Sequence, residues 1–251
     1  MTLAFACWTE PEPVAADGRR IALRRMGAGA SDAAASPVPA LLLHGLDETS
    51  DTWREVASHL PRSLRMLAAD LPGFGGSEAR GSYALSAVAA TMAAVVLEEV
   101  DGPVDLVGHG WGATIAIALA AARPELVRRL VVIGGGWPPW LPAGPADPAP
   151  GLKRSRLLAE AGPRPDPVQR AYLAADPDLA GLPHPERSRV IWGAQARRPR
   201  PHYGEKVVSA LGRCVDPTTV DMITIPGIGS APHLAAAPLV AALLCEVLLT
   251  S

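Results

Sequence analysis

The chain has 251 residues, of which 49% are apolar, so it can bury one large hydrophobic core. Its formal net charge of -2 provides no basic surface for nucleic acid, and no apolar stretch is long enough to span a membrane. The N-terminus does not resemble a signal peptide, and Cys7, Cys214 and Cys245 lie far apart in the sequence. We therefore expect a soluble, cytoplasmic protein without a disulfide framework. The composition does not indicate an oligomeric state.

The first half of the chain alternates short apolar runs with helical patterns. Strand patterns cover residues 18–27, 40–45, 65–78 (ending in a glycine-rich loop), 104–110 and 128–136. Helical spacing covers residues 52–60, 84–100 and 111–127. Strands that alternate with helices predict right-handed crossovers and a parallel sheet with helices on both faces.

A proline-rich segment interrupts this pattern from residue 137 to about residue 187, and it is too long for an ordinary loop. Two short helical pieces lie inside it, so we interpret it as a lid. The alternation resumes with a strand at 188–193, a helix near 204–213, a strand at 220–227 and a closing helix at 238–249. The predicted organisation is therefore a core of residues 1–136 and 188–251, with residues 137–187 as a lid or cap insertion.

Four motifs follow one another along the chain: LLLHGLDETSDTW, DLPGFGGSE, LVGHGWGAT and PGIGSAPHL. In this order they resemble the α/β-hydrolase superfamily, most closely its esterase, haloperoxidase-like and C-C hydrolase branch. The resemblance implies an α/β fold with a mostly parallel sheet, helices on both faces and a short helical lid inserted after the sixth strand. It says less about chemistry, because function depends on the residues of the site.

The residues at the family's catalytic positions depart from its pattern. The family carries its nucleophile at the centre of a G-x-S-x-G elbow, and here Gly110 stands there between Gly108 and Gly112. The positions of the triad's acid and base align with Ala196 and Ser230. Because the triad needs all three groups for full rate, we predict that the protein is not a conventional serine hydrolase.

The resemblance assigns the oxyanion hole to backbone N–H groups, here those of Leu46 and Trp111, which need no side chain at position 110. Such donors are worth roughly 3 to 4 kcal/mol each. We therefore expect Leu46 and Trp111 to form a catalytic anion site. Gly110 either relieves backbone strain in the elbow or opens room for a bulky ring or a water, and the sequence leaves both readings open.

Histidines and one aspartate surround these motifs. His233 lies in the loop that delivers the family's base, so it is a candidate catalytic acid or base, although it could instead pack on the lid. His109 and His44 either pack as structural residues or contact the ligand together with Gly45. Asp47 could face the pocket or solvent.

Four tryptophans fall where this fold faces the pocket or the lid: Trp53, Trp111, Trp137 and Trp140. They suit a small apolar or aromatic ligand, with ordinary core packing as the alternative. We expect no nucleotide cofactor, because no phosphate-binding glycine motif stands in the right context, and no metal. Neither nucleic acid nor membrane is an expected partner.

Three functions compete on these grounds. The first is a non-hydrolytic enzyme of natural product biosynthesis that acts on a polycyclic or polyketide-type molecule by cyclisation, C-C bond formation, rearrangement or elimination. The second is a pseudo-hydrolase, an inactive ligand-binding or interaction protein. The third is a hydrolase whose water is activated by His233 or by a displaced carboxylate.

Overall fold

In the computed structural model, the described residues are 9–27, 38–46, 48–135, 185–197, 200–212 and 216–249. They form one eight-stranded sheet in the order β1-β2-β4-β3-β5-β6-β7-β8. The strands are β1 (Glu12–Ala16), β2 (Arg19–Met26), β3 (Ala40–Leu43), β4 (Met66–Ala69), β5 (Val104–His109), β6 (Val127–Ile133), β7 (Arg187–Gly193) and β8 (Val220–Ile225). Only the β1–β2 and β2–β4 pairs are antiparallel. The predicted mostly parallel sheet is confirmed.

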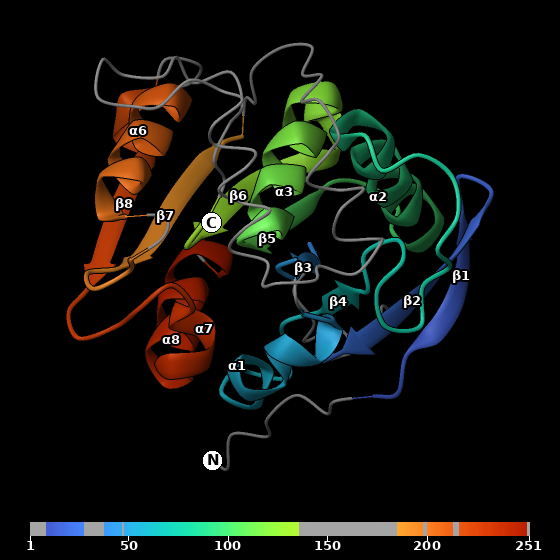
Figure 1. Cartoon of the computed structure of the whole chain (residues 1–251), viewed down its shortest axis with the longest axis horizontal. Helices are drawn as coiled ribbons and strands as arrows, with labels where there is room; N and C mark the ends of the chain where they lie inside the picture. The colour runs from blue at the N-terminus through green and yellow to red at the C-terminus, as the bar shows by residue number, and fades with distance from the viewer. Residues whose placement is uncertain are drawn as a thin grey trace.

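Helices cover both faces of the sheet (Figure 1). The described helices are α1 (Arg54–Ser58), α2 (Leu85–Glu99), α3 (Trp111–Ala122), α6 (Pro201–Leu211), α7 (Pro232–Ala235) and α8 (Ala237–Leu248). Short 3₁₀ turns occur at Ser50–Trp53, Pro124–Leu126 and Pro217–Thr219. Helices α2, α3 and α6 pack on one face, and α1 and α8 pack on the other. None of the helices in the described ranges is long and apolar enough to cross a bilayer.

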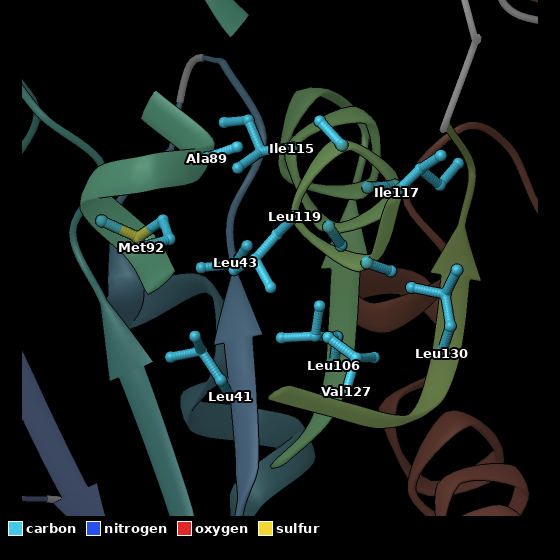
Figure 2. Packing of buried hydrophobic residues seen from close by; sticks show 14 of the residues in the cluster. Leu41, Leu43, Ala89, Met92, Leu106, Ile115, Ile117, Leu119, Val127 and Leu130 are labelled. Carbon is cyan, nitrogen blue, oxygen red and sulfur yellow. The ribbon is translucent and has the colours of Figure 1, made fainter. Parts of the chain in front are cut away.

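The apolar residues of the central strands pack into two hydrophobic clusters, one on each face of the sheet. In β3, Leu41 and Leu43 point into the cluster under α2 and α3, while Ala40 and Leu42 point into the cluster under α1 and α8. Figure 2 shows the first cluster, in which Leu106 of β5 packs beneath the helices. This two-sided burial explains why the strands lack a polar face, as expected for parallel strands between two helical layers.

The ends of several elements differ from the sequence prediction. Strand β1 was not predicted, because four of its five residues are Glu, Pro and Ala, which are poor strand formers, and it pairs with β2 through a tight turn at Asp17 and Gly18. Both turn residues have positive φ (51° and 70°), as in the Asp-Gly hairpin turn. The helix predicted to reach residue 127 ends at Ala122, two residues before Pro124.

The predicted lid lies almost entirely outside the described residues, since residues 136–184 are not among them. Strand β7 begins at Arg187, one residue before the predicted strand. The chain is already paired with the sheet just before this point, because the Glu186 N–H donates to the Arg128 carbonyl at 2.8 Å.

Helix α3 packs very closely against the ends of β3 and β5. A Cβ at Gly112 would lie 2.4 Å from the Leu43 carbonyl oxygen and 2.5 Å from that of His44. A Cβ at Gly108 would lie 2.5 Å from the backbone of Ala113. Both elbow glycines are therefore required by the contact of backbone with backbone.

We predict that Gly112→Ala lowers the free energy of unfolding by about 1–3 kcal/mol, because α3 must move off β3 to admit the methyl group. The corresponding fall in Tm is roughly 2–12 °C, measurable by calorimetry. Gly229→Ala is the matched control, because a Cβ there meets nothing within 4 Å. Equal Tm values for both variants would contradict the close packing of α3.

Candidate functional site

The candidate site lies where the carboxyl ends of β3 and β5 meet. These strands run parallel with Leu43 beside Gly108, so the loop after β3 and the turn after β5 leave the sheet together. Strand β4 flanks β3 on one side and β5 flanks it on the other, which makes this point the switch in strand order. Ligands of open α/β sheets bind at such a point.

Gly110 has the sharp backbone turn of a nucleophile elbow but carries no nucleophilic side chain. It has φ 55° and ψ -116° and immediately precedes α3. Within 4 Å of a Cβ built there, the described residues supply a single atom, the Gly45 Cα at 3.5 Å. The position therefore has room for a side chain that the sequence does not provide. The first turn of α3 directs its backbone N–H groups toward this end of the sheet, which favours anions.

Three ionisable side chains gather beside Gly45, the neighbour of Gly110. Glu48 comes from the loop after β3, His109 from the end of β5 and His233 from α7. Glu48 Oε2 lies 3.0 Å from His109 Nδ1, and Glu48 Oε1 lies 3.6 Å from His233 Nε2. The rings of the two histidines stack at a tilt, with their centroids 4.1 Å apart. We call these three residues the Glu-His-His cluster.

Glu48 is held in place by its own loop. Its side chain accepts a hydrogen bond from the Gly45 N–H at 2.8 Å, and its backbone N–H donates to the Gly45 carbonyl at 3.3 Å. This reciprocal bonding across three residues resembles a capping box. It directs the carboxylate toward the end of β5, and the Glu48 side chain keeps 18% of its surface exposed.

His109 faces acceptors on both sides of its ring. Nδ1 faces the Glu48 carboxylate, and Nε2 lies 3.2 Å from the Ser230 carbonyl oxygen. A neutral ring has one N–H and can donate to only one of these acceptors, whereas an imidazolium donates to both. His109 therefore bridges the Glu48 carboxylate and the backbone at Ser230.

His233 is fully buried. Its Nε2 lies 2.8 Å from the Thr52 hydroxyl, and its ring contacts the indole of Trp53 with centroids 4.9 Å apart. Its Nδ1 has no hydrogen-bond partner among the described residues. The sequence left open whether His233 is an acid or base in the pocket or packs on the lid; in the structure it is the most enclosed member of the cluster.

The surroundings of Glu48 and His233 shift the pKa values of both side chains. Burial acts to raise the pKa of Glu48, but the hydrogen bond and charge of His109, the charge of His233 and the Gly45 N–H outweigh it and lower that pKa to about 2. Burial lowers the pKa of His233 to about 3, and the charge of His109 acts in the same direction against the opposing effect of Glu48. At neutral pH, Glu48 is a carboxylate and His233 is neutral.

The remaining predicted residues support this arrangement. His44 is fully buried, with Nδ1 at 2.6 Å from the Gly45 carbonyl and Nε2 accepting from the Leu71 N–H at 2.9 Å, so it braces the loop. Burial lowers the pKa of His44. Trp53 is a fully buried core residue that touches the cluster through His233, not a pocket wall.

The two residues predicted for the anion site are the chain neighbours of Gly45 and Gly110. Leu46 follows Gly45, Trp111 begins α3, and both side chains pack partly buried on the core under α2 and α3. Of the two remaining triad positions, Ser230 contributes its carbonyl to His109, and Ala196 is a buried residue of the loop after β7. Asp47, Trp137 and Trp140 lie outside the described residues.

Sequence reasoning missed Glu48. The motif HGLDETSDTW contains two adjacent acidic residues, and the first was taken as the candidate. The spacing of Glu48 three residues after Gly45 was the available signal, because a glutamate at that distance can reach back to a backbone N–H. Its meeting with His109 depends on the pairing of β3 with β5, which no local pattern reveals.

Comparison with known proteins agrees with the fold. A family model described as the alpha/beta hydrolase fold matches residues 39–160. Lipase LipV of Mycobacterium tuberculosis is 28% identical over 211 residues, which cover 79% of this chain and 73% of the lipase. The 2-hydroxymuconate semialdehyde hydrolase of Pseudomonas sp. strain CF600 is 37% identical over 127 residues, 48% of this chain and 42% of that enzyme. The match therefore spans less than half the length of this second relative.

A solved structure extends the likeness over nearly the whole chain. The crystal structure of an epoxide hydrolase from Vigna radiata superposes with a TM-score of 0.71 at 18% identity, covering 95% of this chain and 97% of the other. At this identity the likeness concerns the fold. The sheet order, the elbow between β5 and α3, and the family match lead to one assignment: the chain has the α/β-hydrolase fold.

Proposed function

We propose that this protein is a hydrolase in which water, rather than a side chain, attacks the substrate. The observation that carries the proposal is the Glu-His-His cluster near the position over Gly110, which the described residues leave open. Gly45 links the cluster to this space, because its N–H donates to Glu48 and its Cα lies 3.5 Å from a Cβ built at Gly110. A water molecule in that space replaces the missing nucleophile, with the partly exposed Glu48 carboxylate as its proton acceptor.

The reaction proposed for an ester balances without a covalent intermediate. The water oxygen bonds to the carbonyl carbon while one of its protons passes to Glu48. When the bond to the leaving oxygen breaks, the proton returns to that oxygen, and the products are a carboxylic acid and an alcohol. His109 faces Glu48 and keeps it ionised before attack, and His233 closes the other side of the carboxylate.

The substrate oxygen that gains charge needs donors. We assign these to the backbone N–H groups of Leu46 and Trp111, on either side of the elbow, where the first turn of α3 adds its dipole. An acyl substrate would place its carbonyl carbon over Gly110 and its oxygen toward these groups. Backbone donors placed to bind a carbonyl oxygen favour a carboxylic ester or a similar acyl compound as the substrate class.

Hydrolysis is favoured over the non-hydrolytic reaction expected from the sequence. The relatives are named a lipase and a semialdehyde hydrolase, and the solved structure with the same fold is named an epoxide hydrolase. These names lend no support to cyclisation, a polyketide substrate or an inactive protein. The third sequence hypothesis, in which a displaced carboxylate activates water, fits Glu48.

We predict slow turnover of short-chain p-nitrophenyl esters with no covalent intermediate. The release of nitrophenol should be linear from the first turnover, and intact-mass spectrometry of quenched reactions should give the unmodified protein mass. A stable acyl adduct would contradict attack by water. Absence of turnover across ester chain lengths would favour the binding-protein alternative.

We predict that Glu48→Gln lowers kcat for the best ester by about 10²- to 10³-fold, because the amide cannot accept the proton of water. Glutamine keeps an oxygen that can accept the Gly45 N–H, so the loop should stay folded. Glu55→Gln on α1, whose carboxylate is exposed, is the control and should retain full kcat. An unchanged kcat in Glu48→Gln would remove Glu48 from the mechanism.

We predict that Gly110→Ala reduces kcat at least about tenfold, because the methyl group occupies the position proposed for water. Its backbone cost is about 1–2 kcal/mol, since φ is positive at this residue. Gly227→Ala is the matched control: φ there is 78°, the nearest atom to a Cβ is 3.9 Å away, and the residue lies in the turn after β8. If both variants keep the wild-type kcat, water does not stand over Gly110.

A further inference from the structure

Three donors of the kind that bind transition metals converge at the site. One atom of Glu48, one of His109 and one of His233 lie within 4.8 Å of one another. They come from three separate segments, the loop after β3, the end of β5 and α7, so the fold and not a local sequence motif brings them together. Two histidines with one carboxylate form a ligand set typical of catalytic zinc.

The hydrogen bonds of His109 match those of a metal ligand. Its Nε2 faces the Ser230 carbonyl, and a ligating histidine usually donates its second N–H to such a group. That bond directs the Nδ1 lone pair at the Glu48 carboxylate 3.0 Å away. Two acceptors at this distance repel unless a cation lies between them, and either a proton or a metal ion satisfies this requirement.

His233 is the most enclosed of the three donors. It is fully buried, yet its Nδ1 has no hydrogen-bond partner among the described residues, which is a costly state for a ring nitrogen. Its Nε2 is directed at Thr52 and at Glu48, at 2.8 Å and 3.6 Å. A cation beside Glu48 would therefore be bound by Nε2, the nitrogen that faces the carboxylate.

We propose that Glu48, His109 and His233 bind a single Zn²⁺ ion. Metal bonds of 2.0–2.1 Å in a tetrahedron separate the ligand atoms by about 3.3 Å. In the cluster, His109 Nδ1 lies 3.0 Å from Glu48 Oε2 and His233 Nε2 lies 3.6 Å from Oε1, and the three donors lie within 4.8 Å of one another, so small side-chain movements would bring them to this spacing. Zinc binding exchanges the hydrogen bond between His109 and Glu48 for two metal bonds, and His233 Nε2 leaves Thr52 for the ion.

The fourth position of this zinc site would be open toward Gly110. The elbow has no side chain there, and the cluster borders Gly45, whose Cα faces the same space. A zinc-bound water in that position has a pKa lowered to about 7, so hydroxide forms near neutral pH. This role of the ion rests on the proposed function, in which water attacks the substrate. In the zinc-bound protein Glu48 would be a ligand, and the ion would activate the water in its place. It replaces the sequence-based expectation that the protein binds no metal.

The test is zinc binding by chelator-treated, dialysed protein, measured by calorimetric titration with ZnCl₂. We expect one equivalent bound by the wild type, and affinity at least about tenfold weaker in Glu48→Gln and in His233→Gln. His59→Gln is the control, because His59 is exposed at the end of α1 and should not change the affinity. The proposal is overturned if the wild type binds no zinc or if both cluster variants bind it equally well.

A second measurement uses only the wild type, so its result does not depend on whether the variants fold. Titration with CoCl₂ should give the intense visible bands of tetrahedral cobalt, and ZnCl₂ should remove them. The weak spectrum of octahedral, hydrated cobalt would contradict the proposed ligand set.

Ester hydrolysis with and without zinc separates the two proposals. If the protein binds zinc at the cluster but hydrolyses no ester in either state, the zinc site stands and the proposed function fails. If the zinc-free protein hydrolyses esters and ZnCl₂ neither binds nor changes the rate, the proposed function stands and the zinc site fails.

Discussion

The close contact of α3 with the ends of β3 and β5 is the constraint on which the rest of the site depends. Gly112 lies against the backbone of β3, and Gly108 lies against the start of α3, so no side chain fits at either position. This contact forces the sharp turn at Gly110 and sets it beside Gly45. This packing and the hydrogen bond from the Gly110 N–H to the Ile133 carbonyl at 3.1 Å hold the elbow without a side chain at position 110.

The ionisable side chains of the site stand at other positions than the three predicted for a catalytic triad. The elbow centre, the usual acid position and the usual base position carry Gly110, Ala196 and Ser230, which offer no acid or base side chain. A carboxylate and two imidazoles lie instead at Glu48, His109 and His233, with Ser230 contributing only its carbonyl. Because Glu48 is largely enclosed, its negative charge is stabilised chiefly by His109. A buried ionic group of this kind is expensive to maintain unless it has a function, which is why we place the chemistry there.

Much of the fold could be predicted from the sequence, because buried parallel strands read as short apolar runs and amphipathic or apolar helices lie between them. The β1 strand was missed because its own residues are poor strand formers, and the Asp17-Gly18 turn that joins it to β2 was the available signal. Of the site, His109 and His233 were candidates from motif position, and the structure brings them together. Glu48 was missed because its role arises from a loop closed on Gly45 and from strand pairing, both of which are long-range or geometric. The expected contributions of Asp47, Trp137 and Trp140 remain predictions.

The central claim is that water occupies the place of the nucleophile, and a high-resolution crystal structure of the protein at neutral pH tests it most directly. The account predicts an ordered solvent oxygen over Gly110, within hydrogen-bond distance of the Glu48 carboxylate or bound to an ion that Glu48 ligates. The same oxygen should be displaced when a carboxylate product is soaked into the crystal. A protein side chain filling the space over Gly110, with Glu48 turned away from it, would contradict the account.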